Sequence, residues 1–171
     1  MSVFSELLRI KEFRESQAET EVRRRRALLE EAIRLVDELR RKLEEFRIWS
    51  ARKEDEMFDD ICRRIVKLRE IEALRNRISE LRNEERNLEQ GIIDAEEGQR
   101  RASAELDAAV NLLREAGRQK NKFMELARVF SEEARLELER AEEAELEEFR
   151  TRDRNDEEWG DNEYADDAAV A

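Results

Sequence analysis

Apolar residues recur every seven positions along most of this 171-residue chain, and this repeat limits the possible folds more than any other feature. In the first third, one heptad position is occupied by Leu8, Val22, Leu29, Val36 and Leu43, and the position three residues later by Ala18, Ala32, Leu39 and Phe46. Two apolar positions per heptad form the seam of a coiled coil. The pattern therefore predicts long α-helices that pack along a narrow seam. Lys11, Glu15 and Arg25 are polar residues at seam positions, where they lower stability and can fix the register.

A second apolar series begins at Ile71 and keeps its phase for about ten heptads. Its first position carries Ile71, Ile78, Ile92, Leu106 and Leu113, then Ala127, Ala134 and Ala141. Its second carries Leu74, Leu81, Leu88, Ala95, Ala102, Ala109, Ala116, Phe123, Phe130 and Ala144. Because proline is absent and each glycine costs only about 0.5–1 kcal/mol relative to alanine, we expect one long second helix.

The two series are not joined by a continuous seam. Phe58, Ile61, Ile65 and Leu68 follow a spacing that would place the next seam residue at Glu72, yet the second series begins one residue earlier. Either one uninterrupted helix contains a stammer, or the chain turns near residues 62–68. An uninterrupted helix would need a second chain as its partner. A turn would let the chain bury the seam within itself.

The charge of the chain is concentrated at its C-terminal end. Residues 137–171 carry 15 acidic and 4 basic side chains, a net charge of −11, whereas the whole chain has a formal net charge of −12. Beyond about Arg154 the helical period is lost, so we expect residues 155–171 to form a disordered acidic tail. Such a tail repels phosphate backbones, and no nucleic-acid partner is expected.

The residues needed for common catalytic and metal sites are missing. Histidine is absent and Cys62 is the only cysteine, so neither the commonest general base nor a Cys/His zinc site can be assembled. No glycine-rich phosphate loop occurs. We therefore expect no enzymatic activity, no catalytic residue, no cofactor and no metal.

Nothing in the sequence predicts insertion into a membrane. No apolar run approaches the roughly 18–20 residues of a membrane span. The N-terminal segment has neither the basic nor the apolar region of a signal peptide. The expected location is the cytoplasm.

The order of these features resembles the YscO/FliJ-type proteins of type III secretion systems. The resemblance covers roughly residues 4–150 and is closer to the injectisome branch than to the flagellar branch. It rests on the opening Phe4-Ser-Glu-Leu-Leu-Arg-Ile-Lys-Glu-Phe-Arg, on Phe46-x-x-Trp49, on Glu-Asp-Glu-Met-Phe58 and on Val66-Lys-Leu-Arg-Glu-Ile-Glu-Ala-Leu-Arg75.

The resemblance implies a fold, a long antiparallel two-helix coiled-coil hairpin. Residues 1–154 would form the hairpin, with helix 1 at about 3–61, the turn at about 62–68 and helix 2 at about 68–153. Residues opposite each other would then have numbers that sum to roughly 129.

The resemblance also implies a role, a non-enzymatic central stalk that couples to the hexameric secretion ATPase. The protein would be a monomer at the base of the secretion apparatus in the bacterial cytoplasm, with the export gate and secretion chaperones as further partners. The candidate residues for ATPase contact are Leu7, Leu8, Ile10, Phe13, Phe130, Leu136 and Leu138. Those for gate contact are Ile71, Leu74 and Ile78.

A parallel homodimeric scaffold or spacer is the alternative function. It fits the heptads equally well and treats the phase change as a stammer, but it leaves the neighbouring aromatic residues Phe46, Trp49 and Phe58 unexplained.

Overall fold

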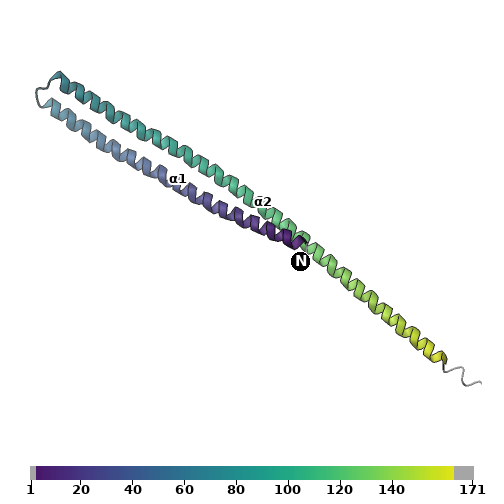
Figure 1. Cartoon of the computed structure of the whole chain (residues 1–171). Coiled ribbons are helices and arrows are strands. Elements are labelled where there is room, and N and C mark those ends of the chain that lie inside the picture. The colour runs from purple at the N-terminus through teal and green to yellow at the C-terminus, as the bar shows by residue number, and fades with distance from the viewer. Residues whose placement is uncertain (1–2, 164–171) are drawn as a thin grey trace, which may run out of the picture. The chain divides into compact units, whose positions relative to one another are not determined.

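The chain folds into two long α-helices. The computed structural model describes the backbone of residues 3–163 and the side chains of residues 3–155. It contains α1 (Val3–Cys62) and α2 (Leu68–Glu163), with no strand in the described part of the chain. The two helices run antiparallel and are joined by residues 63–67 (Figure 1). The expected all-α, antiparallel two-helix hairpin is confirmed. The alternative of one uninterrupted helix paired in parallel with a second chain is wrong, because α1 ends at Cys62 and α2 returns along it.

Contacts divide the chain into two units. The hairpin unit comprises Phe13–Gly117 and therefore contains most of α1, the connection and the first half of α2. The terminal unit comprises Met1–Glu12 and Arg118–Ala171.

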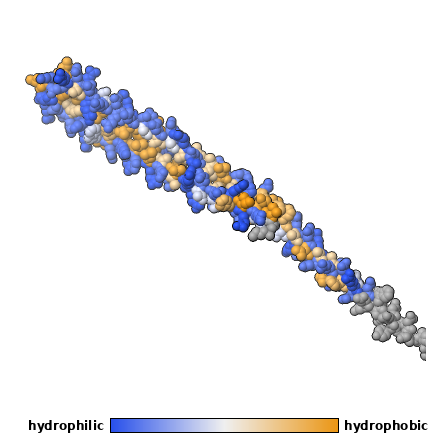
Figure 2. All heavy atoms as spheres, viewed as in Figure 1, coloured by the Kyte–Doolittle hydropathy of each residue, from blue (hydrophilic) through white to orange (hydrophobic). Residues whose placement is uncertain are grey.

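The seam of the hairpin unit is thin. Its buried apolar side chains are Val22, Val36 and Leu43 from α1 and Leu81, Ile92 and Ala109 from α2. All six occupy the heptad positions of the two series. Ser50 is also buried, seven residues after Leu43, so the α1 seam keeps its phase toward the connection. Figure 2 shows apolar residues gathered along the line where the helices meet, with hydrophilic residues around them.

The register of the hairpin unit follows from its cross-helix ion pairs. Arg25 pairs with Glu105, and Arg40 pairs with Glu96. The residue numbers add up to 130 in the first pair and 136 in the second, one and seven above the expected 129.

The connection reverses the chain without glycine or proline. Within the described residues no non-glycine residue has a positive φ. The Glu70 carboxylate accepts a hydrogen bond from the backbone N–H of Lys67 at 2.8 Å and so caps the start of α2. The Arg64 guanidinium donates to Glu70 at 2.7 Å and to Asp60 at 3.2 Å, which ties the end of α1 to the start of α2. Side-chain capping thus replaces the usual turn residues.

The last part of α2 is longer than expected. The helix ends at Glu163 rather than near residue 153, since no proline interrupts it. Residues 164–171, the remainder of the expected acidic tail, lie outside the described residues.

Candidate functional site

The candidate functional sites of this protein are surfaces. No group of three or more Cys, Asp or Glu side chains that could hold a metal ion occurs in the described part of the chain. None of the helices there has a segment apolar and long enough to cross a bilayer. What the described residues offer to a ligand is a set of exposed apolar and charged helix faces.

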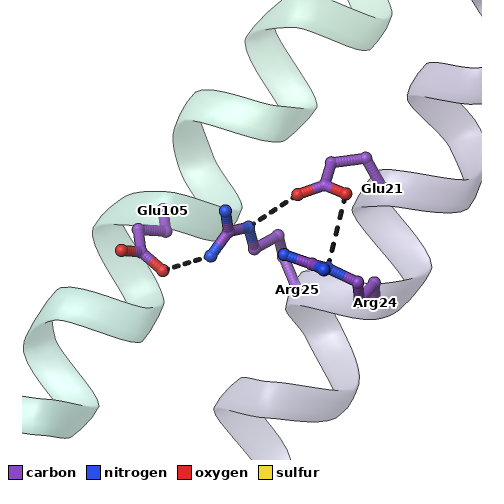
Figure 3. Close-up of polar contacts among 4 residues, drawn as sticks. All are labelled: Glu21, Arg24, Arg25 and Glu105. Atoms are coloured by element: carbon purple, nitrogen blue, oxygen red, sulfur yellow. Dashed lines mark hydrogen bonds and ion pairs between the residues drawn. The ribbon is translucent and has the colours of Figure 1, made fainter.

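Arg25 is a seam-position arginine with two carboxylate partners. Its Nε donates to Glu21 at 2.8 Å on the same helix, and its Nη1 pairs with Glu105 of α2 at 2.5 Å. Figure 3 shows this guanidinium between the two carboxylates, with Arg24 paired to the other oxygen of Glu21. The pair joins the two helices at a defined point, and a polar seam residue of this kind specifies register.

The terminal unit brings the beginning of the chain against α2. The rings of Phe4 and Phe130 stack with centroids 4.3 Å apart and an interplanar angle of 23°. Lys11, another polar seam residue, donates to Gln119 at 2.7 Å, and its ammonium lies 5.1 Å from the centroid of the Phe123 ring. The lysine is therefore satisfied by an amide oxygen and by a cation–π contact.

The residues expected to contact an ATPase differ in accessibility. Leu7 and Leu8 are half-buried, and Ile10, Leu136 and Leu138 are exposed. Phe130 is exposed although it stacks on Phe4. Phe13 is exposed and belongs to the hairpin unit, so the structure does not unite all seven candidates in one unit.

The α2 segment after residue 127 presents a continuous exposed surface. Every residue from Arg128 to Asn155 is exposed. Over residues 131–155 the sequence carries ten acidic and five basic side chains, and Leu138, Leu146 and Phe149 stand among them, each 60–65% exposed. Residues 131–155, here called the acidic segment, combine negative charge with isolated exposed apolar side chains.

The residues expected to contact an export gate lie at the start of α2. Ile71 is exposed, whereas Leu74 and Ile78 are half-buried. Two neighbours that follow the seam spacing in the sequence are exposed instead: Ile65 in the connection is fully exposed and Leu68 is 72% exposed. The signal that could have identified them is the presence of large apolar residues in a segment that no continuous seam could bury.

The two edges of the hairpin seam differ in chemistry. One edge, here called the charged edge, carries three arginines that form ion pairs with glutamates between α1 and α2. Arg40 lies 2.9 Å from Glu96, Arg47 lies 2.9 Å from Glu89, and Glu54 lies 3.2 Å from Arg82. All six residues share one heptad position, as expected for antiparallel helices, in which like flanking positions face each other along each edge of the seam.

The opposite edge forms an open groove of about 620 Å³, here called the apolar groove. From α1 it is lined by Leu28, Ala32, Leu35 and Leu39. From α2 it is lined by Gly91, Ala95, Gly98 and Ala102. Leucines on one wall and glycine or alanine on the other leave a channel along the hairpin that the chain itself does not fill.

Hydrogen bonds and ion pairs shift the pKa values of Glu70 and Arg64 at the connection. The backbone N–H of Lys67, followed by the Arg64 guanidinium, holds the pKa of Glu70 below its usual value. The Glu70 and Asp60 carboxylates raise the pKa of Arg64 in return. These groups stay charged near neutral pH, so the connection keeps its capping contacts there.

The fold and these surfaces define a two-helix coiled-coil protein that presents exposed helix faces. The family model described as type III secretion protein YscO matches residues 4–152. The crystal structure of type III secretion protein YscO from Vibrio parahaemolyticus is similar, with a TM-score of 0.81 and 25% sequence identity, covering 85% of this chain and 92% of that one. No curated protein matches the chain. This chain therefore belongs to the YscO family and is a type III secretion protein.

Proposed function

We propose that this protein is the non-enzymatic central stalk of a bacterial type III secretion system and binds the hexameric secretion ATPase. The observation that supports the proposal most is the uncovered apolar surface of the terminal unit. Ile10 and Leu138 are exposed there, and Leu138 is 62% exposed. Val129 and Phe130, neighbours on α2, are also exposed, and large apolar side chains exposed next to each other are typical of binding surfaces.

The stalk would act mechanically. Two helices have no six-fold symmetry, so a helix pair inside a six-fold ring contacts the subunits unequally. Unequal contact gives each ATPase subunit a different preference among its conformational states, which is the physical requirement for a coupling effect. The negative charge of the acidic segment would favour ring surfaces that carry Lys or Arg.

Further partners belong to the same proposal. Ile71, with the neighbouring Ile65 and Leu68, would contact the export gate through exposed apolar side chains. Leu74 and Ile78 would support that surface from the seam, since both are half-buried. Secretion chaperones would bind the same stalk, which would act as a monomer in the cytoplasm at the base of the apparatus.

Binding to the purified hexameric secretion ATPase of the same system tests the proposal. Ile10→Glu and Leu138→Glu should each weaken binding by roughly tenfold or more, because each places a charge in an apolar contact. Leu112→Glu is the matched control, since Leu112 is 67% exposed but lies in the hairpin unit. ATP turnover should rise with the unaltered stalk and less with the two variants. A stalk that neither binds the hexamer nor alters its turnover would contradict the proposal.

A further inference from the structure

The apolar groove is an unfilled binding surface within the hairpin unit. Leu28 and Leu35 are 41% and 48% exposed on one wall. On the other wall, a Cβ atom built at Gly91 or at Gly98 would meet nothing within 4 Å besides the backbone of its own helix. The exposed leucines lie beside unfilled space above the glycines, so a third helix could insert its own side chains there.

The shape of the groove suits an α-helix. From residue 28 to residue 39 it extends about 16 Å at 1.5 Å per residue, which equals three helical turns. Small residues allow a neighbouring helix to approach to the short end of the usual 8–10 Å spacing. Leucines one heptad apart provide the ridge that such a helix would pack against.

The rim of the groove specifies the charge of the occupant. Glu31 and Glu38 lie on α1 one heptad apart, on the outer side of Leu28 and Leu35 by helical geometry. Both are exposed, and neither forms an ion pair or side-chain hydrogen bond with any described residue. The α2 rim carries Asp94, Arg101 and Glu105, and Glu105 is paired with Arg25 of α1. The acidic α1 rim favours Lys or Arg on the flank of an occupant.

We propose that the apolar groove is a docking site for an amphipathic helix of a partner protein, about three turns long, with a narrow apolar face flanked by Lys or Arg. A second copy of this chain fits less well, because it would bring its own Glu31 and Glu38 toward the same acidic rim. The site lies in the hairpin unit and does not depend on the ATPase contact proposed above.

A peptide-binding measurement tests the proposal. The probe is an 18-residue fluorescein-labelled helical peptide with leucine at both seam positions of the heptad and lysine at the flanking positions. A second peptide carries glutamate at those flanks. Fluorescence anisotropy with the full chain should show the lysine peptide binding at least about tenfold more tightly than the glutamate peptide.

Two small-to-leucine variants locate the binding. Gly98→Leu should fill the groove and weaken binding of the lysine peptide by at least about tenfold. Ala104→Leu is the matched control, because Ala104 is exposed on α2 about 120° around the helix from Gly98. Circular dichroism verifies that each variant remains helical, and Gly91→Leu replaces Gly98→Leu if the latter does not fold.

Three outcomes would overturn the proposal. The first is no binding of the lysine peptide at roughly 1 mM. The second is an equal response of Gly98→Leu and Ala104→Leu. The third is a concentration-dependent dimer in sedimentation that Gly98→Leu abolishes, which would make a second copy the occupant. Reversal of the peptide preference by the double variant Glu31→Lys and Glu38→Lys would support the proposed charge rule directly.

Discussion

Truncation of Leu81 should measure how much the thin seam contributes to stability. Leu81 is the most deeply buried large side chain of the hairpin unit, at 1% exposure. Leu81→Ala removes three carbon groups from the seam, and at about 0.8 kcal/mol per buried group the transfer loss is about 2.4 kcal/mol. A seam between only two helices can close partly around the gap, so the cavity adds little. We expect a loss of about 2–3 kcal/mol in the free energy of unfolding.

Urea unfolding followed by circular dichroism at 222 nm gives the free energy of unfolding of each variant. The slope of that free energy against urea concentration is compared between variants. Leu112→Ala is the control on the same helix, and its loss should stay within about 0.5 kcal/mol because Leu112 is 67% exposed. Equal losses for the two variants would refute the seam described here. A stability that rises with protein concentration would also refute it, since the seam would then form between chains.

Two other perturbations follow from the structure. Gly91→Ala and Gly98→Ala should each raise the free energy of unfolding by about 0.5–1 kcal/mol in thermal or urea unfolding, because an added Cβ meets open space and alanine favours the helix. Gly117→Ala should raise the free energy of unfolding by less, because the added Cβ would lie 3.3 Å from Glu15 Oε1. An equal increase in the free energy of unfolding at all three positions would contradict that contact. The lowered pKa of Glu70 means that its stabilising contribution is present above the ordinary glutamate value of about 4.3 and is lost as the pH falls through the folded-state pKa. Titration of the Glu70 carboxyl carbon by NMR should give a midpoint below that ordinary value, and Glu70→Gln should reduce the pH dependence of stability in this range.

Much of the seam could be predicted from the sequence. Val36, Leu43 and Leu81 lie in the apolar series and are buried. The break between the series near residues 62–68 also coincides with the connection at 63–67. The burial of Ser50 was not predicted, because serine is polar and the prediction followed apolar residues. Ser50 nevertheless continues the heptad series after Leu43.

The candidate surfaces were harder to predict. Ile65 and Leu68 are as apolar as seam residues, and only the connection shows that neither is buried in a seam. Exposure depends on what lies opposite a side chain, and a single helical pattern carries no information about the opposite helix. The same limit applies to the polar seam residue Arg25, whose partner Glu105 lies eighty residues further along the chain.

The seven-residue repeat by itself determined that the chain forms long helices with a narrow seam. A helix buries one face only if its apolar residues recur with nearly the period of the helix, and seven residues are close to two helical turns. Only the tertiary structure decided that the two helices pair antiparallel within one chain. That pairing set like flanking positions against each other, which produced a charged edge of arginine and glutamate and an apolar groove of leucine and glycine. The physical reason is that periodicity is a property of one helix, whereas the chemistry of an edge depends on which two helices meet and in which direction they run.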